Sequence, residues 1–210
     1  LLPMDQPGVT VRPIGLISGS SPFCETFFDD ALASRDDLVG ELNAGWTVGK
    51  RLLQHERSGQ GGLGVSSARP RPVGVTVDLD VAEVAGRYVG MADGRIADSA
   101  FRDEVIRWKM GDAAFRLTQQ RAGEENRSGG TPGEATSIFK LYGATLAQDR
   151  QDLLARLMGL RGFGWEGDSF TEDELGAARS WLASRAVTIY GGTNEVQADI
   201  IAKRVLGLPD

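Results

Sequence analysis

The sequence predicts a mainly α-helical protein in which a helical bundle follows a short β-rich segment. Residues 8–14 alternate apolar and polar side chains, which is the period of a half-buried strand. From residue 41 onward the apolar residues recur at helical spacing instead. Four or five amphipathic helices joined by short links are typical of a helical bundle. We therefore expect two units, a β-rich part at residues 1–40 and a helical part at residues 41–210.

The β-rich part is too small to form a stable sheet alone. Residues 8–14 and 25–28 are predicted as strands, separated by a Ser/Gly/Pro cluster at 18–22. Because two strands are marginal in water, either a partner pairs with them or they end a larger β-domain. The first five residues resemble mid-chain sequence, so we expect that the start is not a native terminus. We expect Cys24 to be a small buried residue without a redox role.

The helical part begins with a helix from Trp46 to at least Ser58, followed by a break in the proline-containing stretch 59–72. Asp98 is a predicted N-cap for a long helix with an apolar face. Residues 122–134 are rich in Gly, Asn, Ser and Pro and predict a loop. Further helices are expected around 80–85, at 135–158 with Ile138, Leu141, Tyr142 and Leu146 inward, after a capping-box-like start at 171–174, and after a cap at Thr193 or Asn194.

Composition excludes several classes of function. The 41% apolar and 25% charged residues are ordinary for a globular protein with a buried core. The net charge of −6 is spread along the chain, which argues against a nucleic-acid groove. The longest apolar runs fall far short of the ~20 residues that a membrane helix needs. With one cysteine and one histidine we expect no disulfide and no zinc or other metal site. No secretory leader opens the chain, so we expect a soluble, cytoplasmic protein.

The segment 189–197 is the most informative part of the sequence, and we call it the signature segment. It consists of a helix end, a Gly191-Gly192 turn and a helix that Thr193 or Asn194 can cap. Such a turn exposes consecutive backbone N–H groups, which suit a carbonyl oxygen or a phosphate. An ordinary capped turn gives the same pattern, so spacing alone leaves both interpretations open.

The residue string itself resembles the C-terminal signature of the acyl-CoA dehydrogenase family. Blocks at residues 4–11, 27–30, 37–46 and 189–207 match the family in order and spacing, so the resemblance spans most of the chain from its start to its end. The resemblance implies the C-terminal four-helix-bundle domain of the acyl-CoA dehydrogenase fold, preceded by the end of the middle β-domain. It also implies that the chain is about half of a family member, with the strands that cradle the flavin supplied by preceding residues or a companion polypeptide.

The resemblance implies an enzyme, a flavoprotein oxidoreductase of lipid metabolism acting on CH–CH groups. Such enzymes oxidise an acyl-CoA to the 2-enoyl-CoA: a carboxylate takes the α-proton and the flavin N5 of FAD takes the β-hydride. Many relatives have the carboxylate directly before the Gly-Thr of the signature, where this chain has Gly191. Either the base lies elsewhere or the subunit is inactive. A second family pattern places it on the first bundle helix, where it matches Glu56. Without the resemblance, Glu56 would be assigned as a solvent-facing residue paired with Arg51 or Arg57.

The resemblance also assigns the other candidate site residues. Arg57 matches an arginine near the substrate, although a structural salt bridge explains it nearly as well. The backbone N–H of Gly191 is expected to polarise the thioester oxygen, with Tyr190 and Gly192 beside the acyl group. Three residues match positions that contact FAD: Thr193, Asn194 and Glu195. An arginine segment that contacts FAD phosphates in relatives is missing, and Arg95 is a weak candidate to replace it.

The expected partners are an acyl-CoA substrate, an electron-transfer flavoprotein, and further copies or a second subunit in a dimer or tetramer. Departures from the family pattern resemble a branch that acts on bulky or dicarboxylic acyl-CoAs, partly as two-subunit complexes. One alternative is a non-catalytic acyl-CoA-dehydrogenase-like subunit that stabilises an active partner. Another is an oxidase, in which oxygen reoxidises the flavin.

Overall fold

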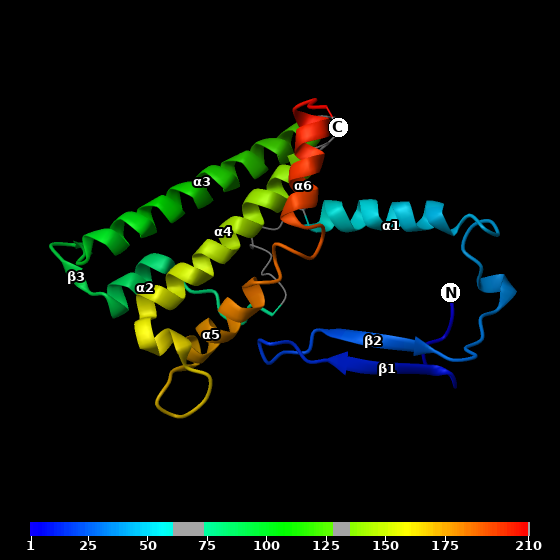
Figure 1. Cartoon of the computed structure of the whole chain (residues 1–210), viewed down its shortest axis with the longest axis horizontal. Helices are drawn as coiled ribbons and strands as arrows, with labels where there is room; N and C mark the ends of the chain where they lie inside the picture. Colours follow the sequence, from blue (N-terminus) through cyan, green and yellow to red (C-terminus); the bar gives the residue numbers. More distant parts are fainter. Residues whose placement is uncertain (61–73, 128–134, 210) are drawn as a thin grey trace.

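The computed structural model describes residues 1–60, 74–127 and 135–209, without the side chains of 54–60, 126–127 and 135–136. Two long helices, α3 (Ser99–Arg127) and α4 (Ala135–Met158), lie side by side, and α2 (Val81–Tyr88) and α5 (Glu172–Ser184) pack against one end of α4 (Figure 1). The short helix α6 (Asn194–Ile200) contacts α4 and continues as a π-helical turn, η3 (Ile201–Val205). The helix α1 (Gly45–Gln60) and a β-hairpin extend away from this group of helices (Figure 1).

The predicted helix starts agree with the structure because the capping side chains make the expected hydrogen bonds. Asp80, which was not predicted as a cap, also accepts hydrogen bonds from the N–H groups of Ala82 and Glu83 at the start of α2. Asp98 does the same at the start of α3, accepting from Ala100 and Phe101. Thr171 and Glu174 form a complete capping box at α5, and Thr193 caps α6.

One predicted loop is wrong over part of its length. Residues 122–127 belong to α3, and only residues 128–134 of the predicted loop lie outside the described residues. The reason is visible in the side chains of this turn, since Gln120 donates to Glu124 and Arg121 lies 3.6 Å from Glu125. These i,i+4 pairs support helix despite the glycine at 123.

The core lies between α2, α4 and α5, with α3 on one side. Val81 and Ala85 of α2 are buried against Leu154 of α4 and Ala177 of α5. The core cluster continues through a run of buried residues at the C-terminal end of α4: Leu153, Leu154, Leu157 and Met158. The apolar residues of this end of α4 are those that are buried, whereas Arg156 on its other face is exposed.

The predicted inward face of α4 is partly wrong. Ile138 is 39% exposed and Tyr142 is 45% exposed. Phe139 takes the buried position instead, because its ring packs edge-on against Phe115 of α3 at a centroid distance of 5.9 Å. Aromatic pairs of this geometry stabilise a helix contact beyond the area that they bury.

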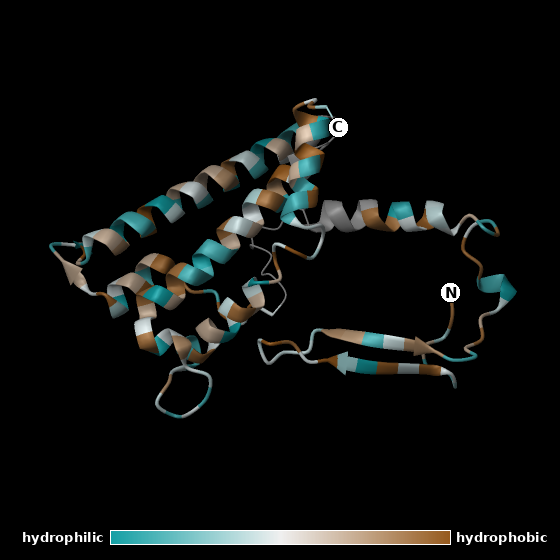
Figure 2. Ribbon diagram, viewed as in Figure 1, coloured by the Kyte–Doolittle hydropathy of each residue, from teal (hydrophilic) through white to brown (hydrophobic). Residues whose placement is uncertain are grey.

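The β-hairpin consists of β1 (Val9–Ile14) and β2 (Phe23–Phe28), paired antiparallel with Val11 opposite Thr26. Figure 2 shows apolar residues along both strands, and Phe23 and Phe28 are exposed. Cys24 is exposed as well, so the prediction of a buried cysteine is wrong. The hairpin is a two-stranded sheet, and within the described residues no layer covers either of its faces.

The turn of the hairpin, by contrast, is held against the helices. Ser18 is buried, and its hydroxyl lies 2.9 Å from the hydroxyl of Ser20. A Cβ atom on Gly74 would lie 3.1 Å from Ala183 of α5 and 3.4 Å from Ser20. Gly74 therefore lies between the hairpin turn and α5, where a side chain would separate them.

Candidate functional site

The signature segment folds as a turn between α5 and α6. After α5 ends at Ser184, the chain forms successive turns to Gly191, and we call residues 185–193 the α5–α6 turn. Gly191 and Gly192 have φ angles of 68° and 95°, in the region that side-chain-bearing residues rarely adopt. The hydroxyl of Thr193 then accepts a hydrogen bond from the N–H of Val196 and starts α6.

Gly192 lies in a close backbone contact with α6. The side chain of Gln197 is buried and donates from Nε2 to the carbonyl oxygen of Gly191 at 3.3 Å. A Cβ atom on Gly192 would lie 2.4 Å from that same nitrogen. Only glycine therefore combines this φ angle with the hydrogen bond of Gln197.

The α5–α6 turn leaves hydrogen-bonding groups available to a ligand. The N–H groups of Gly191 and Gly192 donate to no acceptor within the part of the chain that the structure describes. Oδ1 of Asn194 is buried and has no hydrogen-bond partner there either. The N–H groups suit an acceptor such as a thioester carbonyl. Buried polar atoms are nearly always paired in folded proteins, so the acceptor Oδ1 of Asn194 fits a donor group of a ligand such as a flavin nucleotide.

Glu195 is the carboxylate of the signature segment, and it is poorly suited to take a proton. Its own backbone N–H and the Thr193 hydroxyl hydrogen-bond the carboxylate and hold its pKa below the ordinary value of 4.5. The residue is exposed at the start of α6. A carboxylate with a lowered pKa is a weaker base than an ordinary one. Glu195 therefore serves as a hydrogen-bond acceptor.

Tyr190 contacts a lysine that the sequence did not single out. Its half-buried ring lies 5.7 Å from Nζ of Lys140 on α4. The same Nζ donates a hydrogen bond of 2.6 Å to the carbonyl oxygen of Val187 within the α5–α6 turn. Burial lowers the pKa of the Lys140 ammonium. Little in the sequence indicates that Lys140 belongs to the site, because a single lysine in an amphipathic helix is usually a surface residue.

A second α4 side chain, Gln148, also contacts this turn and was missed. Its amide nitrogen donates to the carbonyl of Ser184 at 3.1 Å and to the hydroxyl of Thr188 at 3.2 Å. A glutamine in the middle of a helix gives no sequence signal, because only the packing of α5 on α4 brings these acceptors near it.

The structure brings together the predicted residues 190–195, and it does not test the predicted base. Glu56 and Arg57 belong to the last part of α1, where side chains lie outside the described residues. Their roles stay predictions. Arg95, the suggested substitute for a phosphate-binding arginine, is exposed on the short strand β4 (Arg95–Ile96), which pairs with β3 (Met91–Ala92).

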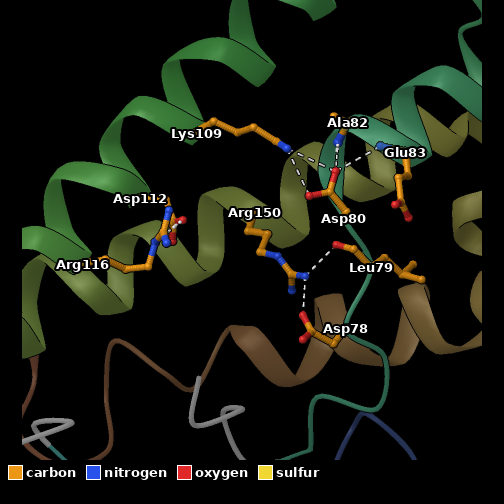
Figure 3. Close-up of polar contacts among 9 residues, drawn as sticks. All are labelled: Asp78, Leu79, Asp80, Ala82, Glu83, Lys109, Asp112, Arg116 and Arg150. Carbon is orange, nitrogen blue, oxygen red and sulfur yellow. Dashed lines mark hydrogen bonds and ion pairs between the residues drawn. The ribbon is translucent and has the colours of Figure 1, made fainter. Parts of the chain in front are cut away.

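A separate charged cluster surrounds a cavity of about 180 Å³ beside the start of α2. Figure 3 shows Arg150 of α4 directed at Asp78 and at the carbonyl of Leu79, each at 2.6 Å, and Lys109 of α3 directed at Asp80. Arg150 is largely buried. Because these cations are paired with carboxylates, the cluster fastens residues 78–80 to α3 and α4, and we assign it a structural role.

The described residues offer neither a metal centre nor a membrane-spanning helix. Across residues 1–60, 74–127 and 135–209, no group of three or more His, Cys, Asp or Glu side chains is arranged to hold a metal ion. In the same described part, no helix is both long enough and apolar enough to cross a membrane.

Comparison with known proteins defines the class. The family model "Acyl-CoA dehydrogenase, C-terminal domain" matches residues 43–206. The chain therefore belongs to the acyl-CoA dehydrogenase family, as its signature segment and the ordered sequence blocks predict. This family depends on FAD in general. The mainly helical fold with few strands is that of its C-terminal domain, which confirms the predicted fold class.

Particular relatives are found among curated proteins. Acyl-CoA dehydrogenase IpdE1 of Mycobacterium tuberculosis is 36% identical over 209 residues, which cover all of this chain and 50% of the relative. The IpdE1 of Mycolicibacterium smegmatis is 34% identical over 215 residues, again covering all of this chain and 48% of the relative. The chain thus spans about half the length of the curated relatives that it matches.

Solved structures with the same fold include the ChsE4–ChsE5 complex of Mycobacterium tuberculosis. That match has a TM-score of 0.74 and 25% identity, and it covers all of this chain and 51% of the other. A glutaryl-coenzyme A dehydrogenase in complex with glutaryl-CoA matches with a TM-score of 0.70, covering 99% of this chain and 49% of the other. At 18% identity, this second likeness concerns the fold alone.

Proposed function

We propose that this chain is the C-terminal part of an FAD-dependent enzyme that oxidises an acyl-CoA thioester to the 2-enoyl-CoA. The α5–α6 turn is the observation that supports the proposal most. Its N–H groups at Gly191 and Gly192 and the buried Oδ1 of Asn194 have no partner among the described residues. The match of residues 43–206 to the acyl-CoA dehydrogenase family suggests which ligands these groups bind, namely an acyl-CoA and FAD.

In this proposal the chain's residues bind and orient two ligands. The N–H of Gly191 donates to the thioester oxygen, and this donation stabilises the negative charge that develops there when the α-proton leaves. Tyr190 and Gly192 line the acyl group. Three residues at the start of α6 hold FAD: Thr193, Asn194 and Glu195. FAD, when bound, supplies an acceptor for the β-hydride at N5.

Glu56 is the proposed base. A glutamate with an ordinary pKa near ~4.3 is a weak base, so a water-poor slot must raise its pKa before it can take the α-proton. Gly191 has no side chain that could take the α-proton. Glu195 is exposed and has a lowered pKa, which makes it a poor base. Arg57, next to Glu56, orients that carboxylate or holds the CoA moiety.

The proposal extends to the organisation of the protein. Residues 1–40 form the end of a β-domain and residues 41–210 form the helical domain. When bound, FAD would supply the electrons that an electron-transfer flavoprotein, the expected partner in the cytoplasm, would accept. The assembly is a dimer or tetramer of like or unlike subunits, and the ChsE4–ChsE5 complex is a relative described as two different chains.

One observation favours a second candidate function. Gly191 occupies the position where many family members have their catalytic glutamate, and a subunit without a base would serve to stabilise an active partner. In that case Glu56 is a surface residue, and its replacement changes little.

The two candidates are separated by turnover of Glu56→Gln in the complete protein that contains this chain. A general base contributes ~10²–10⁴-fold to rate, so we expect turnover of acyl-CoA to fall by at least about 100-fold with FAD still bound. The control is Glu83→Gln, at an exposed position on α2, which should keep wild-type turnover. Turnover of Glu56→Gln close to wild type would leave only the non-catalytic candidate.

A further inference from the structure

Two side chains of α4 hold the turn that carries the signature glycines. Lys140 donates from Nζ to the carbonyl oxygen of Val187 at 2.6 Å, and Val187 itself is buried. Gln148, two helical turns further along α4, donates to the carbonyl of Ser184 and the hydroxyl of Thr188. Nε2 of Gln148 also lies 3.4 Å from the carbonyl oxygen of Arg185, so these two side chains hydrogen-bond four of the residues 184–188.

The fastened residues continue directly into the candidate site. The carbonyl oxygen of Thr188 accepts a hydrogen bond from the N–H of Asn194 at 3.1 Å, across the α5–α6 turn. Gln197 closes the other side by donating to the carbonyl of Gly191. Gly191 and Gly192 therefore form the tip of a closed loop whose base rests on Lys140 and Gln148. A shift of the base moves the tip.

The charge of Lys140 suits this position. The last carbonyl groups of a helix have no partners within that helix and carry the negative end of its dipole. An ammonium group placed just beyond the end of α5 at Ser184 satisfies one carbonyl of the following turn and opposes that negative end. Burial disfavours the charged form and lowers the pKa of Lys140. The ring of Tyr190, 5.7 Å away, offers its π face to the same cation.

We propose that Lys140 and Gln148 are positioning residues for the thioester: they set where the N–H of Gly191 points. This role rests on the proposed function. Rate depends steeply on such placement, because a donor displaced by about 1 Å can cost ~100-fold in rate. The two residues are expected to affect the chemical step more than the binding of acyl-CoA.

The first test compares Lys140→Met with Lys109→Met in the complete protein loaded with FAD, using acyl-CoAs of graded chain length. Lys140→Met loses the donor and keeps the aliphatic stem, so kcat per bound flavin should fall about tenfold or more, with KM changed less than about threefold. Lys140→Arg, which keeps a donor, should recover most of that loss. Lys109→Met removes an exposed lysine near Asp80 and should keep the wild-type kcat. A kcat of Lys140→Met within twofold of wild type overturns the proposal.

The second test does not depend on activity. Amide hydrogen exchange at residues 185–193 should become faster in Lys140→Met and in Gln148→Met, and stay unchanged in Lys109→Met. Gln148→Met keeps the test open if Lys140→Met folds poorly. Unchanged exchange in both variants overturns the positioning role. If the wild-type protein turns over no acyl-CoA, the proposed function fails, whereas faster exchange still supports the anchoring of the turn.

Discussion

Gly192 shows at the scale of one residue why the signature segment needs its glycines. Two separate constraints act there, a φ angle of 95° and a neighbour, Nε2 of Gln197, that a Cβ would approach to 2.4 Å. Gly90 has a nearly identical φ of 92°, with no atom within 4 Å of its would-be Cβ. Comparing Gly192 with Gly90 therefore separates the backbone strain of a positive φ angle from the steric contact with Gln197.

We predict that Gly192→Ala destabilises the protein by about 2–4 kcal/mol, because strain and the displacement of Gln197 add. Gly90→Ala should cost only about 1 kcal/mol, the strain alone. Thermal unfolding of both variants measures the difference, and flavin content reports whether the α5–α6 turn still binds. Equal losses of stability in the two variants would show that the contact with Gln197 carries no energy.

Single residues also mark how far the sequence could predict the site. Thr193 was one of two predicted caps because its side chain acts on the N–H of a residue three positions later, within local sequence. Lys140 and Gln148 were not predicted, since their acceptors lie 47 and 36 positions away. Hydrogen bonds at such separations depend on tertiary packing, which no local pattern encodes.

Among the elements, α5 begins with a complete capping box, and its stability should depend on pH. Glu174 is buried and accepts hydrogen bonds from the N–H of Thr171 at 2.8 Å and from the hydroxyl of Tyr88 on α2 at 3.0 Å. It also forms an ion pair with Arg161, whose Nε lies 3.1 Å from the carboxylate. The hydrogen bond from Thr171, followed by those of its other partners, holds the pKa of Glu174 below the ordinary 4.5. One carboxylate therefore joins α2, α5 and the 3₁₀ turn η2 (Gly159–Phe163).

A lowered pKa means that the folded state favours the ionised form of Glu174. Its contribution is fully present well above the unfolded-state pKa of 4.5 and is lost as pH falls through the lower folded-state pKa. We predict that Glu174→Gln loses about 2 kcal/mol of stability at neutral pH, and that the gap to wild type narrows below about pH 4.5. Thermal midpoints of both proteins measured across pH 3 to 7 give this difference. A gap that is constant over that range would contradict the assignment.

Helix boundaries were predictable where a side chain caps the helix. They were less predictable where side-chain pairs stabilise further turns at the helix end. The starts of α2, α3, α5 and α6 follow from capping residues, each of which acts within its own first turn. The end of α3 was placed too early, because glycine and polar residues favour a loop in isolation. The i,i+4 pairs at residues 120–125 outweigh that preference, because they extend a long helix that has already formed from Ser99 onward.

The whole molecule leaves large apolar side chains exposed on the β-hairpin and on α1, including Phe28, Trp46 and Leu52 (Figure 2).

The family could be predicted from the sequence because several blocks match in order, and the match over residues 43–206 agrees. The identity of the base is another matter. It depends on how the end of α1 faces the α5–α6 turn, which is a question of tertiary arrangement.

The most direct test follows the flavin itself. The complete protein, loaded with FAD and free of oxygen, is mixed with acyl-CoAs of graded chain length while the absorbance of the oxidised flavin is recorded. We predict that the absorbance of the oxidised flavin in the wild-type protein is lost within one turnover. In Glu56→Gln this absorbance should be lost at least about 100-fold more slowly, because the α-proton must leave before or with the hydride. Bleaching of Glu56→Gln at the wild-type rate would contradict the assignment of Glu56 as the base.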